Sequence, residues 1–338
     1  MARPRSDRAR LGLQCAFDAI VRDRRLHSLC GRWPLTARVT PLHGSGAGVY
    51  YVSEVGAYYL EAGEPPGVWF GAAADRLGVS GEVDPEVFVR LLDGVDPTGS
   101  FLLGRRFGER SARGFDVTFS APKSVSLLAA VADESARAEV WAAHDAAVVA
   151  VLGWVQRNVQ TRFPVHGEVC SVDVAGIAAG VFRQHVSREL DPQLHSHAVI
   201  AARVLAPDGR WLSMDARNLM GSQHTVTGLY QAALRAELTR RLGVAWLNPE
   251  RGLADLAGVD RWVVEAFSTR SVQVSGRLDA KLNRFRDGLD REPTMRERRR
   301  LSREAVLDSR RSKSAAEPAA TLRAGWRARL DRLGVPAR

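Results

Sequence analysis

The spacing of apolar residues along this chain of 338 residues predicts a mixture of strands and helices. Strands are expected where apolar and polar side chains alternate or where short apolar runs lie between turn residues. The predicted strands cover residues 37–42, 115–119, 176–187 and 194–205. The predicted helices cover residues 49–62, 80–95, 135–159 and 222–242. Gly243 provides a C-terminal stop for the last of these helices, and the sequence beyond Asp260 is largely helical.

The two ends of the chain are basic, whereas its middle is nearly neutral. The net charge is +10 and the pI is near 10.3. Residues 1–34 hold eight Arg against three Asp, and residues 281–313 hold twelve Lys or Arg against six acids. Basic flanks around a neutral body are typical of segments that clamp nucleic acid while the middle does chemistry. For residues 1–34, a solvated or disordered Arg-rich extension remains an open alternative.

Cysteine usage and hydropathy bear on the cellular compartment. The three cysteines lack any CxxC spacing, which argues against a disulfide framework and against a cysteine zinc site. No apolar run is long enough to be expected to span a bilayer. We therefore expect a cytoplasmic protein without a membrane partner.

Four of the five tyrosines form two doublets, Tyr50-Tyr51 and Tyr58-Tyr59, after a glycine-rich hinge. On a helix, Tyr50 and Tyr58 lie on nearly the same face, because eight residues make a little over two turns. A phenol oxygen can attack phosphate when a cation neutralises the phosphate charge. The alternative is that aromatic residues at this spacing pack a core.

His195 and His197 lie two residues apart on a predicted strand, so both imidazoles face the same side. Such a pair can chelate a divalent ion when a neighbouring strand supplies a third ligand. The candidates are Gln184 and His185, which point to opposite faces of a regular strand. The alternative is an ordinary, partly buried strand.

Asp116 and Lys123 are further candidates. Asp116 could orient a metal-bound histidine or accept a tyrosyl proton, although an isolated Asp is often only a surface residue. Lys123 begins a predicted helix, where charge and free backbone amides together favour phosphate. The Lys-Ser pairs follow Pro122 and Ser312 rather than Gly, so we expect no nucleotide-hydrolysing motor domain in this chain.

Several stretches together resemble one known family. They are the two tyrosine doublets and residues 77–84, 116–125 and 182–200, within a resemblance that spans roughly residues 36–335. The chain resembles the relaxase domain of MobF-type conjugative relaxases, the TrwC/TraI group of HUH endonucleases. This resemblance implies an α+β fold, with a five-stranded antiparallel sheet flanked by helices. It further implies a catalytic core over residues 35–265 and a helical, basic lid over residues 266–338. Members of the family usually continue into a helicase, and this chain departs from that pattern, because we expect no helicase domain in it.

The resemblance also implies an activity. The family nicks one DNA strand at the nic site of a transfer origin through a 5′-phosphotyrosine intermediate, and then rejoins the strand. Tyr50 resembles the first nucleophile and Tyr58 the second, while Asp116 resembles the acid that supports the metal ligands or the nucleophile. His195 and His197 resemble two of three histidine ligands.

The third metal ligand departs from the family pattern. Gln184 stands eleven residues before His195, where the family has its first histidine, and His185 follows it. A Gln oxygen favours a harder divalent ion, Mg²⁺ or Mn²⁺, over Zn²⁺ or others. A working site with two histidines and Gln184, a shifted register that uses His185, and an impaired site remain the alternatives.

The implied partners are single-stranded DNA and a hairpin at a transfer origin, with a coupling protein, accessory relaxosome proteins and a separate helicase acting in trans. The resemblance assigns the loop with Arg105, Arg106, Arg110 and Arg113 to DNA binding, and Lys123 and Arg183 are further candidates for contact with DNA. The alternative functions are a catalytically impaired origin-binding protein and a rolling-circle replication initiator.

Overall fold

The computed structural model describes residues 36–44, 65–165, 167–250, 252–309 and 317–335. By its internal contacts the chain divides into residues 1–35 and residues 36–338, and all the described residues belong to the second unit. The tyrosine doublets and the predicted helix over 49–62 therefore lie outside the described residues.

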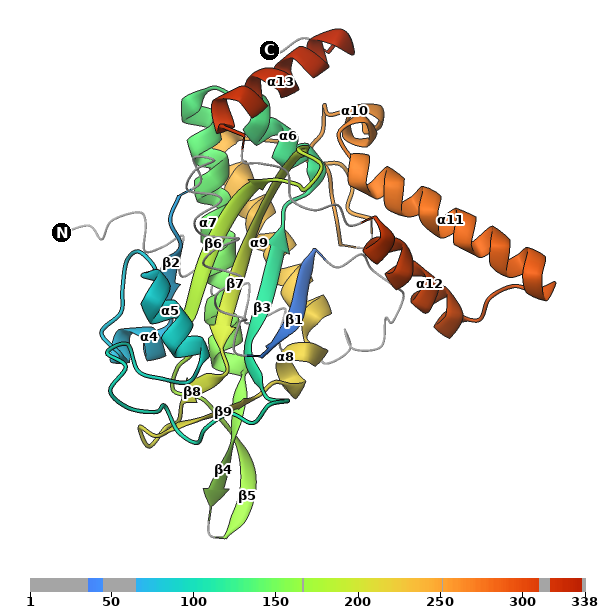
Figure 1. The fold of residues 1–338 in the computed structure, drawn as a ribbon. Coiled ribbons are helices and arrows are strands. Elements are labelled where there is room, and N and C mark those ends of the chain that lie inside the picture. Colours follow the sequence, from blue (N-terminus) through green and yellow to red (C-terminus); the bar gives the residue numbers. More distant parts are fainter. Residues whose placement is uncertain (1–35, 45–64, 166, 251, 310–316, 336–338) are drawn as a thin grey trace. The chain divides into compact units, whose positions relative to one another are not determined.

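A five-stranded sheet forms the centre of the second unit (Figure 1). Its strands are β1 (Ala37–His43), β2 (Val68–Phe70), β3 (Ala112–Ser120), β6 (Ala179–Val186) and β7 (Pro192–Ala201). Their order is β1-β3-β7-β6-β2, and every neighbouring pair is antiparallel. This confirms the predicted antiparallel sheet, with β7 as its central strand.

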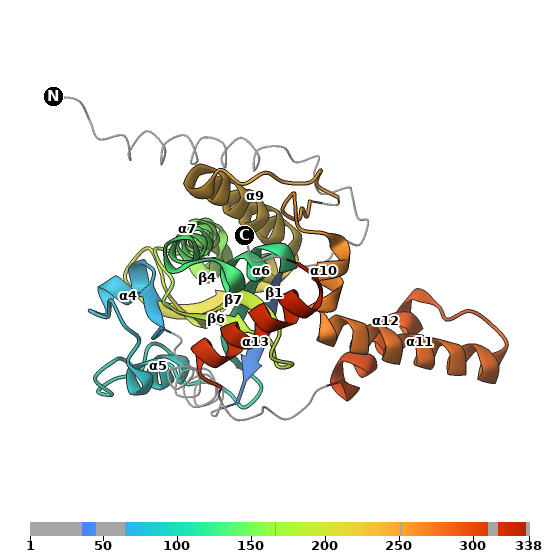
Figure 2. The same cartoon turned by 90° about the horizontal axis from the view of Figure 1, so that it is seen from above.

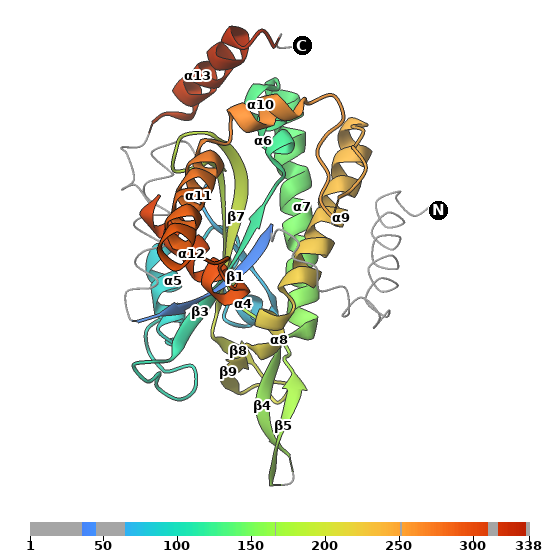
Figure 3. The ribbon, with the colours of Figure 1, turned by 90° about the vertical axis from the view of Figure 1, so that its right-hand side faces the viewer.

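Three helices cover one face of this sheet: α6 (Lys123–Val131), α7 (Glu134–Asn158) and α9 (Gln223–Leu242) (Figures 1 and 3). Phe119 of β3 packs against Tyr230 of α9, with 5.4 Å between the ring centroids. Gly243 ends α9 in the left-handed conformation, at φ 65°, as predicted. Contrary to expectation, α7 is long and apolar enough to cross a membrane by length and composition alone. Its buried residues pack against the sheet and α9, as in a core helix.

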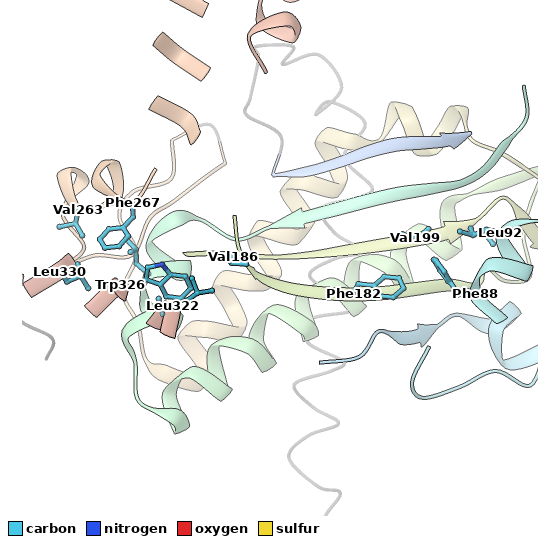
Figure 4. Close-up of a cluster of buried hydrophobic side chains, with 13 residues drawn as sticks. Phe88, Leu92, Phe182, Val186, Val199, Val263, Phe267, Leu322, Trp326 and Leu330 are labelled. Atoms are coloured by element: carbon cyan, nitrogen blue, oxygen red, sulfur yellow. The ribbon is translucent and has the colours of Figure 1, made fainter. Parts of the chain in front are cut away.

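The other face of the sheet is covered at one end by α5 (Pro85–Leu92), and α4 (Ala72–Arg76) lies nearby. Figure 4 shows Phe88 and Leu92 of α5 beside Phe182 and Val199 of the sheet. The Phe88 and Phe182 rings meet edge to face, with centroids 5.2 Å apart. This packing leaves the opposite end of the same face open.

A second sheet, which the sequence did not predict, has the order β5-β4-β9-β8. Its strands are β4 (Gln160–Val165), β5 (Glu168–Asp173), β8 (Arg203–Leu205) and β9 (Trp211–Asp215). The strand expected over 194–205 is thus divided between β7 and β8. The β4-β5 hairpin has little apolar alternation because most of its residues are exposed, and this explains why the sequence pattern did not reveal it.

The C-terminal region is helical, as expected. It contains α10 (Arg261–Ala266), α11 (Thr269–Leu289), α12 (Met295–Asp308) and α13 (Ala319–Arg332), while the short α8 (Arg217–Gly221) precedes α9. Helices α11 and α12 form an antiparallel pair (Figure 2). Lys281 of α11 lies 2.9 Å from Asp308 of α12. We refer to α11 and α12 as the helical lid. Helix α13 packs instead on α6.

Candidate functional site

His195 and His197 lie on the central strand and face the open end of the sheet. Strand alternation places both on one side, with ring centroids 5.3 Å apart and ring planes at 73°. Both line a cleft of about 860 Å³ between the sheet and the helical lid. Residues of both lid helices, including Val274 of α11 and Leu307 of α12, line the same cleft.

The structure places Gln184, rather than His185, on the histidine face. Gln184 of β6 pairs directly with His195 of β7, and residues directly opposite each other in an antiparallel pair point to the same side. The Gln184 side chain is buried, and its Nε2 has no hydrogen-bond partner among the described residues. His185 points to the other face, between Trp141 of α7 and Trp326 of α13, with centroids 6.2 and 6.1 Å away.

Hydrogen bonds fix the orientation of both imidazoles. His195 Nδ1 donates to the Gln193 carbonyl at 2.8 Å, and His197 Nδ1 donates to Asp116 Oδ2 at 2.8 Å. Because a carbonyl and a carboxylate can only accept, the lone pair of each ring lies on Nε2. A carboxylate that holds a histidine in this way is the usual support for a metal ligand.

The environment keeps His195 neutral. Burial lowers the pKa of His195 to about 3, and the neighbouring His197 acts in the same direction. Asp116 and the Gln193 carbonyl oppose this shift. A neutral imidazole is the form that binds a metal, so His195 needs no deprotonation at neutral pH.

Two imidazole nitrogens and one amide oxygen form a donor set that fits a divalent ion. Within the described parts of the chain, no three His, Cys, Asp or Glu side chains are grouped as a metal site. Gln184 can supply the third ligand beside the two histidines, because its buried amide has unused hydrogen-bonding capacity beside His195. The amide can be turned to present Oε1, since its oxygen and nitrogen are interchangeable in shape.

Lys123 ties the start of α6 to β7. Its Nζ donates to the Pro192 carbonyl at 2.6 Å and to Gln193 Oε1 at 3.1 Å, and the side chain lines the cleft. Burial lowers the pKa of Lys123 to about 8, and the negative charge of Asp191 opposes the shift. Lys123 therefore lines the same cleft as the histidine pair, and it also holds the strand that carries the histidines.

The predicted arginine loop lies at the other end of β3 from the histidines. Arg105, Arg106 and Arg110 are exposed, between α5 and β3. Arg113 lies within β3, 3.5 Å from Asp93. Sequence reasoning missed Arg203, which donates to the Arg105 carbonyl and stacks on Phe107, with its guanidinium 4.1 Å from the ring centre.

Arg183 is not brought to the cleft. It lies on the helix-covered face, where it pairs with Asp145 and stacks on Trp141 of α7, 4.7 Å from the ring centre. Sequence reasoning instead missed Arg38 and Thr40 of β1, which line the cleft. Their alternation with the buried Ala37 and Val39 was the available signal.

The comparisons with known proteins agree on one family. The TrwC relaxase family matches residues 45–333. The chain is 31% identical over 302 residues to the multifunctional conjugation protein TraI of Escherichia coli, and the match covers 86% of this chain. It is 30% identical to TraI of strain K12 over the same length. The chain spans only 16% of the length of these two relatives.

Solved structures give the same result. The chain is similar to the conjugative relaxase TrwC in complex with OriT DNA, both metal-free (32% identity, TM-score 0.75) and metal-bound (33% identity, TM-score 0.76). It is also similar to TrwC complexed with a 27-mer DNA that comprises the recognition hairpin and the cleavage site (31% identity, TM-score 0.74). Each match covers 89% of this chain and all of the solved one.

Proposed function

The chain belongs to the TrwC relaxase family, and from this premise we propose that it nicks one DNA strand at the nic site of a transfer origin and later rejoins it. The observation that carries this proposal is the histidine pair at the cleft, with Gln184 opposite His195 and Asp116 bonded to His197. The cleft is also lined by basic side chains, including Arg38 and Lys123, which suits a ligand with a phosphate backbone.

A divalent ion would be held by His195, His197 and Gln184. When bound, the ion neutralises and polarises the scissile phosphate. Asp116 holds the His197 ring so that its lone pair lies on Nε2. The amide oxygen of Gln184 is a harder donor than imidazole, which favours Mg²⁺ or Mn²⁺ over Zn²⁺.

Tyr50 is the proposed nucleophile for the first cut. Its phenol oxygen forms a bond to phosphorus, the bond from phosphorus to the 3′ oxygen breaks, and that oxygen leaves as a 3′-hydroxyl. The 5′-phosphotyrosine retains the energy of the broken ester, so attack by a 3′-hydroxyl rejoins a strand and releases the phenol. Tyr58 is the proposed nucleophile for the second transfer.

The DNA would lie between the sheet and the helical lid. Arg38 and Thr40 from β1 and Arg270 from α11 line the cleft, where they can contact phosphates. Binding should therefore weaken as salt increases. The proposal also includes a catalytic core over 35–265 and a C-terminal lid region over 266–338 that contains the helical lid. Its proposed partners are the DNA hairpin, a coupling protein, accessory proteins and a separate helicase.

The test is a covalent-adduct assay. An inverted repeat in the DNA beside the gene would identify the candidate nic site. A single-stranded oligonucleotide that carries it is then incubated with protein and Mg²⁺, Mn²⁺ or Zn²⁺. We expect a protein-DNA adduct with wild type and Tyr51→Phe, and none with Tyr50→Phe. Tight hairpin binding without an adduct in any metal would instead identify an origin-binding protein that does not cut.

A further inference from the structure

Asp191 begins the segment that carries the histidine pair, but it does not belong to the candidate ligand set. It lies immediately before β7, and only 2% of its surface is exposed. A buried carboxylate is costly unless it is paired and hydrogen-bonded. Its partners therefore indicate what this position does.

The Asp191 carboxylate is bonded to two C-terminal helices. It accepts from the Thr269 backbone N–H at 2.8 Å and lies 3.3 Å from the Thr269 hydroxyl, at the first residue of α11. It also lies 3.2 Å from Arg329 Nη1 of α13. One acidic side chain thus joins the turn before β7 to the base of the helical lid and to the last helix.

Arg329 and Trp326 extend this connection. Arg329 also donates to the Ala266 carbonyl and stacks on Phe267, 4.6 Å from the ring centre, just before α11 begins. Trp326 Nε1 donates to the Leu190 carbonyl at 2.7 Å, next to Asp191. Arg329 therefore contacts the residues just before α11, and Trp326 ties α13 to the turn that carries Asp191.

We propose that Asp191 is a positioning residue that fixes the base of α11, so that the lid closes over DNA in the histidine cleft and retains it. Helix α11 has 21 residues, so a small rotation at its base moves its far end by a large distance. Ser268, Arg270 and Ser271 at that base line the cleft. This proposal rests on the proposed function, because the retained ligand is the strand that is cut.

Asp191 links the lid to the segment that carries the histidines, and it lines the same cleft. It precedes His195 by four residues, and Lys123 holds the intervening Pro192 carbonyl. The lid base and the histidine pair thus share one short, buried segment. Weakening the anchor should loosen the lid and leave the histidines in place, because their hydrogen bonds to Gln193 and Asp116 are separate.

The test compares Asp191→Asn and Arg329→Gln with wild type in nicking kinetics. Asn retains an acceptor for Thr269 and loses the ion pair, so Asp191→Asn should fold even where Asp191→Ala does not. Arg329→Gln removes the same ion pair but keeps the negative charge that acts on Lys123, so a rise in KM in both variants is assigned to the lid. We expect KM for the oligonucleotide to rise about tenfold, as for the loss of a charge-assisted hydrogen bond. The value of kcat should stay within about twofold, and the double variant should add little to either single one.

Glu139→Gln is the matched control. Glu139 of α7 lies 2.8 Å from Arg241 of α9, so this change also removes an ion pair between two elements, but on the helix-covered face. It should leave KM unchanged. A fall in kcat at constant KM in Asp191→Asn, or the same rise in KM in Glu139→Gln, would overturn the proposal.

Hydrogen exchange separates this proposal from the proposed function. In the DNA-free protein, amides of α11 and α12 should exchange faster in Asp191→Asn and Arg329→Gln than in wild type, while α7 is unchanged. Unaltered exchange in the lid would refute the anchor even if wild type cuts DNA. Faster exchange, with faster release of the bound oligonucleotide, would support it even if no adduct forms.

Discussion

His144 lies against the helix-covered face of the central sheet and His195 lies on its cleft face, and these two histidines differ in what their nitrogens do. On the helix-covered face, His144 of α7 bonds to Tyr230 and to Ser196, each at 2.8 Å, so both nitrogens are used. On the cleft face, His195 uses Nδ1 for the Gln193 carbonyl, so the lone pair lies on Nε2 of a ring that lines the cleft. Burial lowers the pKa of both to about 3. A lowered pKa therefore does not distinguish the two histidines, whereas the location of the lone pair does.

The largest expected difference in the rate of adduct formation is between substitutions at His195 and at its neighbour Ser196. Adjacent strand residues face opposite sides, so His195→Ala should remove a metal ligand and leave the core unchanged. Adduct formation should fall on the order of 10³-fold, because the ion supplies several kcal/mol of charge stabilisation. The rate is measured with saturating metal in a single turnover.

Ser196→Ala is the control for this variant. It should leave the adduct rate within about twofold and lower the free energy of unfolding by about 1–2 kcal/mol, because His144 Nε2 loses a buried partner. Urea unfolding measures this loss. If Ser196→Ala abolishes cleavage or His195→Ala only destabilises the protein, the distinction between the two faces is wrong.

Asp116 provides the next largest effect. Asp116→Asn removes the charged acceptor of the His197 Nδ1–H and should lower the affinity for Mn²⁺ by about 10- to 100-fold. Metal titration in the absence of DNA measures it, and metal-free hairpin binding should not change. Unchanged Mn²⁺ affinity with slow cleavage would instead indicate that Asp116 acts on the tyrosyl proton.

The cleft face shows how far the sequence alone could go. The spacing of His195 and His197 placed both on one side of a strand, and the structure agrees. The choice between Gln184 and His185 remained open, because the sequence does not state the register of β6 against β7. The pairing of Gln184 with His195 needs long-range hydrogen bonds that no local pattern encodes.

The helix-covered face was less predictable. The contacts of His144 with Tyr230 and Ser196 join residues 86 and 52 positions apart, from three different elements. Arg183 could likewise be assigned to DNA on its charge alone, although its partner Asp145 lies on the core side. In both cases, tertiary packing decided the role of a side chain whose local sequence was uninformative.

Acid should destabilise the protein in part through His144. The folded pKa of His144 is about 3 and its ordinary value is 6.5, so the unfolded chain binds a proton that the folded chain excludes. Its contribution is fully present above pH 6.5 and is lost as the pH falls toward 3, by up to about 1.4 kcal/mol per pH unit. The same sign applies to His195.

Urea unfolding between pH 7 and pH 4 measures the slope. In His144→Gln the slope should be shallower than in wild type by about one histidine, because the titrating group is removed. The variant will start from a lower stability at pH 7, so the comparison uses slopes and not absolute values. If the free energy of unfolding changes with pH equally in the variant and in wild type, His144 binds a proton as readily in the folded state as in the unfolded state.

The smallest expected effect on metal binding comes from substitutions at the two candidates for the third ligand, Gln184 and His185. Gln184→His should raise the affinity for Zn²⁺ relative to Mg²⁺ by about fivefold, because imidazole is a softer donor than an amide oxygen. The matched change on the opposite face, His185→Gln, should leave both metal affinities unchanged and disturb only the packing between Trp141 and Trp326. Competitive metal titration of the two variants compares the faces directly. A loss of metal affinity in His185→Gln, with none in Gln184→Ala, would mean that β6 turns its other face to the histidines.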